Sequence, residues 1–521
     1  MNHNPAPVGS NYVQPVGNGI VFLVLTVISI IYVQWTWTDI LGQFGGDNAW
    51  YLHMAKYLSP FTSPSDTTKY FAQHSPYPPL IPIILALTGG AESLLVAHLT
   101  TTLFLLGSFL MLYIFAIQLI GSRLIAIGIV LVFATLAMTY MHALEILSEN
   151  YYLFFCLLSI VLAGYSEKNK KNIGVLMAAS LLAGSSFLIR SAGLSMIAAF
   201  TVYIWINYPR EWRIKLYMIM LSPYILSKVF DFKSGESFSY ISMMSGKLSL
   251  FHSLNDVVSH MGAHIGRFIN AWFNIFSATT NVGVIVVGIL GILSLIGLAN
   301  RVRKKHLDGL YLFFYILLLL LWPFSPEAER YLYPVTALML GHAVYIVHLW
   351  VKNIRIGGLA KGALIAVLLI NNMPALAFTY DRYTSALPED FSEYRHAAIW
   401  YGNKRQVDYR GVIMIQTLTE AMKAIKQAVP EDQCVYSIKP SIVGMYSGRV
   451  SIQTPLEKLS DQEFLHDVSE KGCQYFFILP FSSISYRAPF YPVNRIKGFS
   501  EQIFSVNRDE VSYAALYKLK N

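Results

Sequence analysis

Long apolar runs, separated by short polar segments, fill the chain from about residue 19 to residue 379. Each run is close to the roughly 20 residues that an α-helix needs to cross the apolar core of a bilayer. Lipid offers no partner for open backbone groups, so a run that lies in it must be helical. The pattern therefore predicts eleven membrane-spanning helices, at residues 19–37, 92–119, 123–140, 149–165, 173–189, 191–208, 214–230, 280–300, 308–324, 331–350 and 361–379.

The segments that connect these runs alternate in their content of basic residues. One set carries Lys and Arg at residues 123, 168–171, 210–215, 301–305 and 352–361, whereas the other set is longer and poorer in bases. Loops rich in Lys and Arg lie in the cytoplasm. We therefore expect a multi-pass protein of the cell inner (plasma) membrane with a cytoplasmic N-terminus. The loop of Asp47 and everything after residue 379 should lie outside.

Composition agrees with this class. The chain has 521 residues, 55% hydrophobic and only 13% charged, whereas soluble domains contain about 25% charged residues. A net charge of +9 would also suit nucleic acid, but the bases cluster between apolar runs and are better explained as topology signals. The bilayer is thus an expected partner, and nucleic acid is not. The start of the chain lacks Lys and Arg and does not resemble a cleavable signal peptide.

Two regions depart from the spanning pattern. The loop at residues 38–91 is too long for a simple connection, and its apolar pieces at 47–58 and 78–87 predict short helices in the membrane interface. At about residue 380 charged residues return, and short strand-like runs alternate with amphipathic helical patterns. The helical patterns lie at 416–429 and 459–472, and the strand-like runs at 434–438, 449–453 and 473–481. The predicted fold class is a polytopic α-helical membrane domain, residues 1–379, followed by an extracytoplasmic α/β domain, residues 380–521.

Charged residues within or beside apolar segments are costly and are functional candidates. On the predicted outer side they are Asp47, Glu145, Glu149, Arg190, Glu327, Glu329 and Arg330. Acids and bases gathered at one face suit a polar, anionic substrate, because a planar guanidinium fits phosphate well. Each residue also has a structural explanation. Asp47 could cap the helix that follows it, and each Arg could form an ion pair with a glutamate.

Several common chemistries have no motif in this chain. There is no Walker A sequence, no GxGxxG after a strand, no HExxH and no Asp-x-Asp pair. A transferase that works outside the cytoplasm has neither nucleotide sugars nor ATP. It would need a donor carried in the membrane, such as a lipid-phosphate-linked sugar.

Six segments, taken in order, carry a resemblance to a known family. They are GGDNAWYLHMAKYL (45–58), YPPLIPIILAL (77–87), LEILSENYYLF (144–154), GSSFLIRSAGL (184–194), ERYLYPV (329–335) and KPSIVGMYSGRVS (439–451). The ordered set resembles the GT-C membrane glycosyltransferases. It is most similar to the bacterial branch that includes relatives of the dolichyl-phosphate-mannose protein mannosyltransferases and the lipid A aminoarabinose transferase.

This resemblance implies a polyprenyl-phosphate-sugar donor and an inverting transfer at the outer face of the membrane. It implies that Asp47 is the general base and that Arg330 contacts the donor phosphate. The acceptor would be a glycan, a lipid or a protein. Many relatives have Asp-Glu at the first-loop motif, whereas here Asn48 follows Asp47, so a second carboxylate is missing from that motif.

The expected site extends beyond these two residues. The candidate substrate-binding residues are Arg330, Arg190, Glu149, Glu329, Tyr331, His74, Tyr77 and Lys228. Arg190 or Lys228 would help to balance the charge of the leaving phosphate. No cofactor is certain, but carboxylates such as Asp47 and Glu145 could hold a divalent Mg or Mn ion that does the same work.

Two other functions stay open. The same charges could line the path of a transporter or flippase for a lipid-linked or anionic solute, or the chain could be a non-catalytic envelope scaffold. Charges at the outer face rather than at the midplane favour the transferase, as does the domain that follows.

The cysteines Cys434 and Cys473 each begin a strand-like run in the region expected outside the cytoplasm. In an oxidising compartment they could form a disulfide. The alternative is two buried thiols that face apart.

The predicted topology is tested with reporter fusions. A reporter fused after Lys361 should read as cytoplasmic, and one fused after Tyr380 should read as outside. A cytoplasmic signal at both positions would remove the last span and place the C-terminal region in the cytoplasm.

Overall fold

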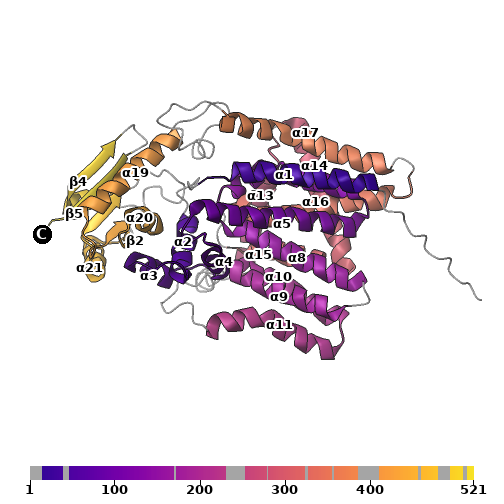
Figure 1. Cartoon of the computed structure of the whole chain (residues 1–521), viewed down its shortest axis with the longest axis horizontal. Coiled ribbons are helices and arrows are strands. Elements are labelled where there is room, and N and C mark those ends of the chain that lie inside the picture. Colours follow the sequence, from indigo (N-terminus) through magenta and orange to yellow (C-terminus); the bar gives the residue numbers. More distant parts are fainter. Residues whose placement is uncertain are drawn as a thin grey trace, which may run out of the picture.

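The computed structural model describes residues 15–38, 46–168, 172–229, 253–278, 280–322, 327–354, 357–384, 410–455, 459–478, 493–507 and 513–520. A bundle of helices makes up most of the molecule, and a small sheet with its own helices lies at one end of it (Figure 1). Three short helices, α2 to α4, lie between the bundle and the sheet (Figure 1).

Each of the eleven predicted apolar segments contains a helix. They are α1 Pro15–Trp35, α5 Leu94–Ile120, α6 Arg123–Ala134 with α7 Ala137–Ala143, α8 Ser148–Lys168, α9 Ile173–Ile189, α10 Leu194–Asn207, α11 Arg210–Val229, α14 Asn281–Arg303, α15 Leu307–Leu321, α16 Ala328–Val351 and α17 Gly357–Thr384. The fold is thus a polytopic helical one, as predicted. Among the described residues, four helices are long and apolar enough to cross a membrane, or five if the bent pair α6 and α7 is one span. The count of eleven full spans stays a prediction.

Helix α14 shows why these helices suit lipid. One stripe of it, which includes Val287, Leu290 and Leu293, is buried in the bundle, whereas Ile285 and Ile292 are 62% and 61% exposed. An apolar side chain gains nothing from exposure to water, and large exposed apolar surfaces mark contact with a membrane or a partner. The outward apolar stripe of α14 therefore indicates a surface that faces lipid.

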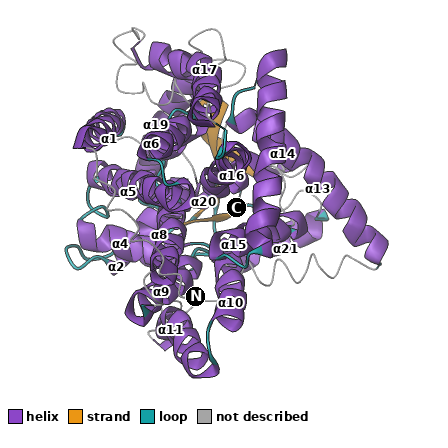
Figure 2. Ribbon diagram, turned by 90° about the vertical axis from the view of Figure 1, so that its right-hand side faces the viewer, coloured by secondary structure: helices purple, strands orange, loops and turns teal. Residues whose placement is uncertain are grey.

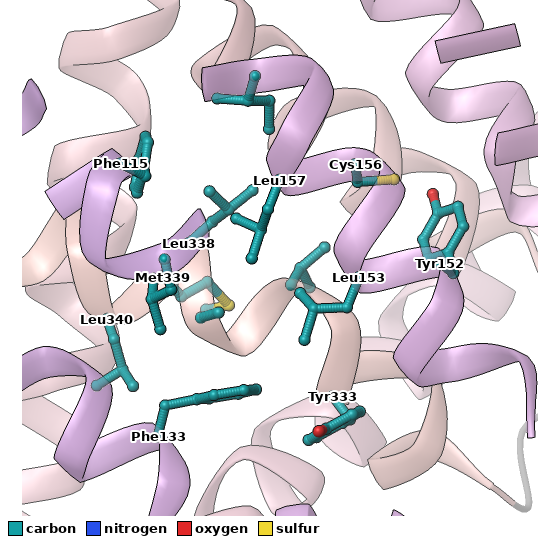
Figure 3. Close-up of a cluster of buried hydrophobic side chains, with 14 of the residues drawn as sticks. Phe115, Phe133, Tyr152, Leu153, Cys156, Leu157, Tyr333, Leu338, Met339 and Leu340 are labelled. Atoms are coloured by element: carbon teal, nitrogen blue, oxygen red, sulfur yellow. The ribbon is translucent and has the colours of Figure 1, made fainter. Parts of the chain in front are cut away.

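Helix α16 is the centre of the bundle. It contacts α5, α8, α14 and α15, and in the view of Figure 2 it lies among them. Figure 3 shows how Tyr333, Leu338, Met339 and Leu340 of this helix interdigitate with residues of α5, α6 and α8. Because the helix is packed on most sides, the position of its first turn is fixed by the core.

The segment between α1 and α5 forms three short helices: α2 Gly46–Leu58, α3 Asp66–Gln73 and α4 Leu80–Thr88. The first and third coincide with the two predicted interfacial helices. Ser65 caps α3 through a hydrogen bond from the Thr68 amide. Helix α4 begins directly after Pro78 and Pro79, where proline costs no helical hydrogen bond. Their place in the membrane interface stays a prediction.

A further helix, α13 Leu254–Ile275, precedes α14 and begins with a capping box between Ser253 and Asp256. It packs against α16 and α15. It occupies the second half of the segment between the predicted spans 214–230 and 280–300, and residues 230–252 lie outside the described residues.

The C-terminal region contains a five-stranded sheet in the order β2-β1-β3-β5-β4. Its strands are β1 Val435–Ser437, β2 Ser451–Gln453, β3 Tyr475–Ile478, β4 Ser500–Asn507 and β5 Tyr513–Leu519, and its helices are α19 Arg410–Ala428, α20 Pro440–Ser447, α21 Asp461–Lys471 and α22 Val493–Phe499. Strand β1 pairs in parallel with β2 and β3, whereas β5 pairs antiparallel with β3 and β4. This is the α/β fold expected there, although the sequence did not indicate β4, β5, α20 or α22.

In this sheet Cys434 and Cys473 form a disulfide, with their Cα atoms 4.9 Å apart. Cys434 immediately precedes β1 and Cys473 lies two residues before β3, and these two strands are neighbours in the sheet. The parallel pairing of β1 and β3 therefore brings the two thiols together at the end of the sheet where both strands begin.

We predict that reduction of this bond destabilises the C-terminal region by roughly 3–4 kcal/mol, because the bond closes a loop of intermediate length in the unfolded chain. Thermal unfolding with and without reductant would measure the change, and a Cys434→Ser/Cys473→Ser double variant should lose the sensitivity. Ready alkylation of both thiols in native, unreduced protein would contradict the bond.

Candidate active site

Four helix ends meet at the end of the bundle that lies nearest the sheet. They are the first turns of α2, α8 and α16, which carry Asp47, Glu149 and Arg330, and the end of α9, which is followed by Arg190. The partial charges of helix ends favour acids at an N-terminus and bases at a C-terminus. Asp47, Glu149 and Arg190 satisfy this rule. Arg330 does not, so it depends on carboxylates around it.

The break between α9 and α10 places Arg190. This residue is extended, with φ −153° and ψ 139°, and a single 3₁₀ turn, Ser191–Gly193, leads into α10. A Cβ atom on Gly193 would lie 2.4 Å from the backbone nitrogen of Phe187. Only glycine allows the chain to turn this tightly, and the turn projects Arg190 from the bundle end.

Asp47 is held by two side chains. Its Oδ1 accepts a hydrogen bond of 2.6 Å from the Tyr77 hydroxyl, and its Oδ2 accepts one of 2.6 Å from Nη2 of Arg330. Both oxygens thus contact side chains rather than capping α2. Burial raises the pKa of Asp47, but the charge of Arg330 and the two hydrogen bonds outweigh this effect, and the pKa lies below its ordinary value.

Arg330 binds three carboxylates at once. Its Nε donates to Glu149, its Nη2 to Asp47 and its Nη1 to Glu327 at 3.0 Å. The Glu149 side chain is fully buried, whereas that of Glu327 is 53% exposed. An exposed ion pair contributes little, so the Glu327 contact is the one that a substrate anion could replace most easily.

Glu149 links the two arginines. Its Oε1 pairs with Arg330 and also lies 2.5 Å from Nη1 of Arg190. The Arg190 guanidinium lies 5.4 Å from the centre of the Tyr331 ring, within cation–π range. The result is a continuous chain of charges, Asp47–Arg330–Glu149–Arg190. Removing one member would leave a buried charge without its partner.

A cavity of about 770 Å³ opens beside this network. Its walls include Asp47, Arg190 and Arg330 together with the aromatic side chains of Trp50, Tyr51, Tyr70, Phe71, Tyr77, Trp322 and Tyr331. The C-terminal region closes one side of it, from Ile438 to Ser441 and from Ser451 to Gln453. Aromatic faces beside paired charges suit a ligand with both apolar and anionic parts.

The side chains that the structure describes at this end do not form a set that fits a bound metal ion. No group of three or more His, Cys, Asp or Glu side chains in the described residues is arranged to hold one. Asn48, the residue after Asp47, is fully buried and donates a hydrogen bond to Glu145. The positive charge beside Asp47 comes from Arg330 instead.

The structure brings most of the predicted site residues together. Asp47, His74, Tyr77, Arg190, Arg330 and Tyr331 line the cavity, and Glu149 lies directly behind it. Glu329 instead accepts a hydrogen bond of 2.7 Å from Asn274 of α13. Lys228 is exposed near the end of α11, with its ammonium 5.8 Å from the centre of the Tyr224 ring. These two residues do not contribute to the cavity wall.

Sequence reasoning missed the contribution of the C-terminal region, and Lys439 above all. The segment that contains it, 439–451, stood out only through the family resemblance. Lys439 lies more than 390 positions after Gly46, yet its Nζ is 3.5 Å from the place where a Cβ atom of Gly46 would be. Proximity between such distant residues leaves no local pattern.

Comparisons with known proteins bear on the fold. No family model matches the sequence, and no curated protein is significantly similar to it. Among solved structures, ArnT from Cupriavidus metallidurans in the apo state matches with a TM-score of 0.54 at 10% identity, over 96% of this chain and 98% of that one. The same protein bound to undecaprenyl phosphate matches with a TM-score of 0.53 at 11% identity, over 97% and 98%.

The oligosaccharyltransferase of Archaeoglobus fulgidus, in a complex with Zn and sulfate, matches with a TM-score of 0.50 at 13% identity, over 87% of this chain and 67% of that one. These neighbours are GT-C glycosyltransferases. At such low identity the similarity concerns the fold. The chain therefore has the fold of the GT-C membrane glycosyltransferases, as the resemblance implied.

We predict that Arg330→Lys lowers activity by at least roughly 10²-fold. Lysine keeps the charge but cannot hold several carboxylates in fixed directions. Arg330→Gln should also move the acid limb of the pH profile to higher pH. The pKa of Asp47 lies below its ordinary value because of Arg330, and burial alone would raise it. Activity should then be lost earlier as the pH falls.

The matched control is Arg267→Lys in α13, where the arginine is exposed, and it should be near neutral. Thermal unfolding in detergent separates loss of activity from loss of fold. Full activity of Arg330→Lys, with an unchanged pH profile, would show that Arg330 does not organise the site.

Proposed function

We propose that this protein is an inverting glycosyltransferase that moves a sugar from a polyprenyl-phosphate donor to an acceptor hydroxyl at the outer face of the membrane. The observation that supports it most is the carboxylate of Asp47, held by Arg330 and Tyr77 in the wall of a large cavity at the bundle end. The GT-C fold agrees with this proposal, since one neighbour of that fold was solved with undecaprenyl phosphate.

Asp47 acts as the general base in this mechanism. The acceptor oxygen attacks the anomeric carbon and gives its proton to Asp47, while the bond from that carbon to the phosphate oxygen breaks. The lipid phosphate leaves with the electron pair. A single displacement of this kind inverts the anomeric centre and needs no protein nucleophile.

A carboxylate is a far weaker base than an alkoxide, and the lowered pKa of Asp47 weakens it further. A weak base cannot form an alkoxide in advance, so the proton must transfer late, after the bond to the leaving phosphate has stretched and the sugar has become strongly electrophilic. The carboxylate then mainly orients the hydroxyl and stabilises the positive charge that develops on the sugar.

Arg330 couples the two ends of the reaction. As Asp47 gains a proton it loses its negative charge, while the phosphate gains one. The guanidinium contacts Asp47 through Nη2 and offers Nη1 at the exposed edge, where Glu327 now binds. A donor phosphate that replaces Glu327 would keep the guanidinium paired throughout. Arg190, on the same glutamate, adds a second positive charge.

A transporter would need a path through the bundle. The cavity instead lies at one end, where α2 and the C-terminal region cover it. A direct test of the transferase uses purified protein, a panel of polyprenyl-phosphate sugars and mass spectrometry of the products. Movement of such lipids from one leaflet of a vesicle membrane to the other, without any covalent product, would favour a flippase.

Asp47→Asn should lower transfer by roughly 10²–10⁴-fold, as removal of an acid–base group does. Asparagine keeps the size of the side chain but cannot accept the proton. Binding of the donor should change little, because the carboxylate faces the acceptor. If Asp47 only capped a helix, asparagine would serve as well.

Asp66→Asn is the matched control, because Asp66 also lies in the first turn of a short helix but is exposed and paired with Lys69. It should be near neutral. An Asp47→Asn protein that folds, binds donor and turns over normally would end the assignment of Asp47 as the base.

A further inference from the structure

The C-terminal region is fixed firmly against the helices that carry the base. Ser441 donates a hydrogen bond of 3.1 Å to the Gly46 carbonyl, and its own carbonyl lies 3.1 Å from Nε2 of His53. Thr67 donates to the Gly448 carbonyl at 2.9 Å. A Cβ atom on Gly444 would lie 2.1 Å from the ring of Phe71, so α20 approaches α3 as closely as a glycine permits.

This docking brings one cation beside the base. Lys439 immediately precedes α20 and lines the cavity. Its Nζ lies 3.5 Å from the place where a Cβ atom of Gly46 would be, and Gly46 is the residue before Asp47. The ammonium group therefore lies near the start of α2, on the part of the cavity wall that the C-terminal region supplies.

The two sides of the cavity differ in chemistry. The bundle side carries Arg190, Trp322 and Tyr331, at the ends of helices with apolar exteriors. The C-terminal side carries Ser441, Ser451 and Gln453 in addition to Lys439. The isoprenoid tail of a donor must stay in lipid, so its phosphate lies on the bundle side. The C-terminal side is then left for the acceptor.

From this arrangement we infer that the C-terminal side of the cavity is an acceptor subsite for a hydroxyl-rich molecule that bears an anionic group, a phosphate or a carboxylate, and that Lys439 binds that group. This inference rests on the proposed function. Arg190 and Arg330 lie on the bundle side of the cavity, whereas Lys439 lies on its C-terminal side. Hydroxyl and amide side chains beside it suit the hydroxyl groups of a sugar.

The test measures binding, not turnover. Trp50 and Trp322 line the cavity, so their fluorescence can follow titration of the purified full chain with glucose, glucose 6-phosphate and glucuronate. We expect the wild type to bind at least one anionic sugar about tenfold more tightly than glucose, the scale of one charge-assisted hydrogen bond. Comparing the two anions distinguishes phosphate from carboxylate.

Lys439→Gln should abolish the preference for the anionic sugar while leaving the affinity for glucose and for farnesyl phosphate, a stand-in for the donor, unchanged. Lys471→Gln is the matched control, because Lys471 lies in the same region, on the surface of α21, and pairs with Asp467. It should keep the preference.

Three results would overturn the inference: equal binding of neutral and anionic sugars by the wild type, binding of none of them, or a Lys439→Gln variant that weakens farnesyl phosphate instead. The last would make Lys439 a donor contact. Absence of transfer from any donor would end the proposed function but would not alter these binding ratios, so the two failures can be told apart.

Discussion

The ion pairs between Arg330 and the two acids Asp47 and Glu149 are the constraint on which the site depends. Glu149 is fully buried, and Arg330 binds it, Asp47 and Glu327 at once. Buried charges are tolerable only when they are paired. The first turns of α2, α8 and α16 must therefore stay in register with one another, and the tightly packed α16 supplies the rigid reference. The orientation of Asp47 is thus a property of the whole bundle end.

The same constraint supports the role proposed for Asp47. The charge of Arg330 holds the pKa of Asp47 below its ordinary value, and in the proposed displacement the guanidinium would contact both the base and the leaving phosphate. The amide of Asn48, the residue after Asp47, donates a hydrogen bond to Glu145. The C-terminal region completes the cavity, because α20 docks on α2 and α3 and brings Lys439 beside Gly46.

The sequence predicted the helices well because hydropathy along eleven apolar runs is a local property. It also singled out Asp47, Arg190 and Arg330, since charges beside apolar runs are conspicuous, and the structure places these three residues in the wall of one cavity. It did not distinguish Glu329 from Arg330, although neighbouring residues lie about 100° apart around a helix; Glu329 turns to Asn274 and Arg330 to the cavity. Lys228 was expected near the leaving phosphate, but it lies away from the cavity wall. It belongs to α11, which packs against α9, and no local sequence pattern shows this. The place of Lys439 in the cavity wall was not predicted, because only the tertiary fold brings it beside Gly46.

The central claim, a single displacement with Asp47 as the base, is tested most directly by the stereochemistry of the product. Purified full-length protein would be supplied with a polyprenyl-phosphate sugar of known anomeric configuration, and the configuration of the new glycosidic bond would be read by nuclear magnetic resonance. We predict complete inversion. Retention of configuration would require a mechanism other than a single displacement, and it would contradict the account.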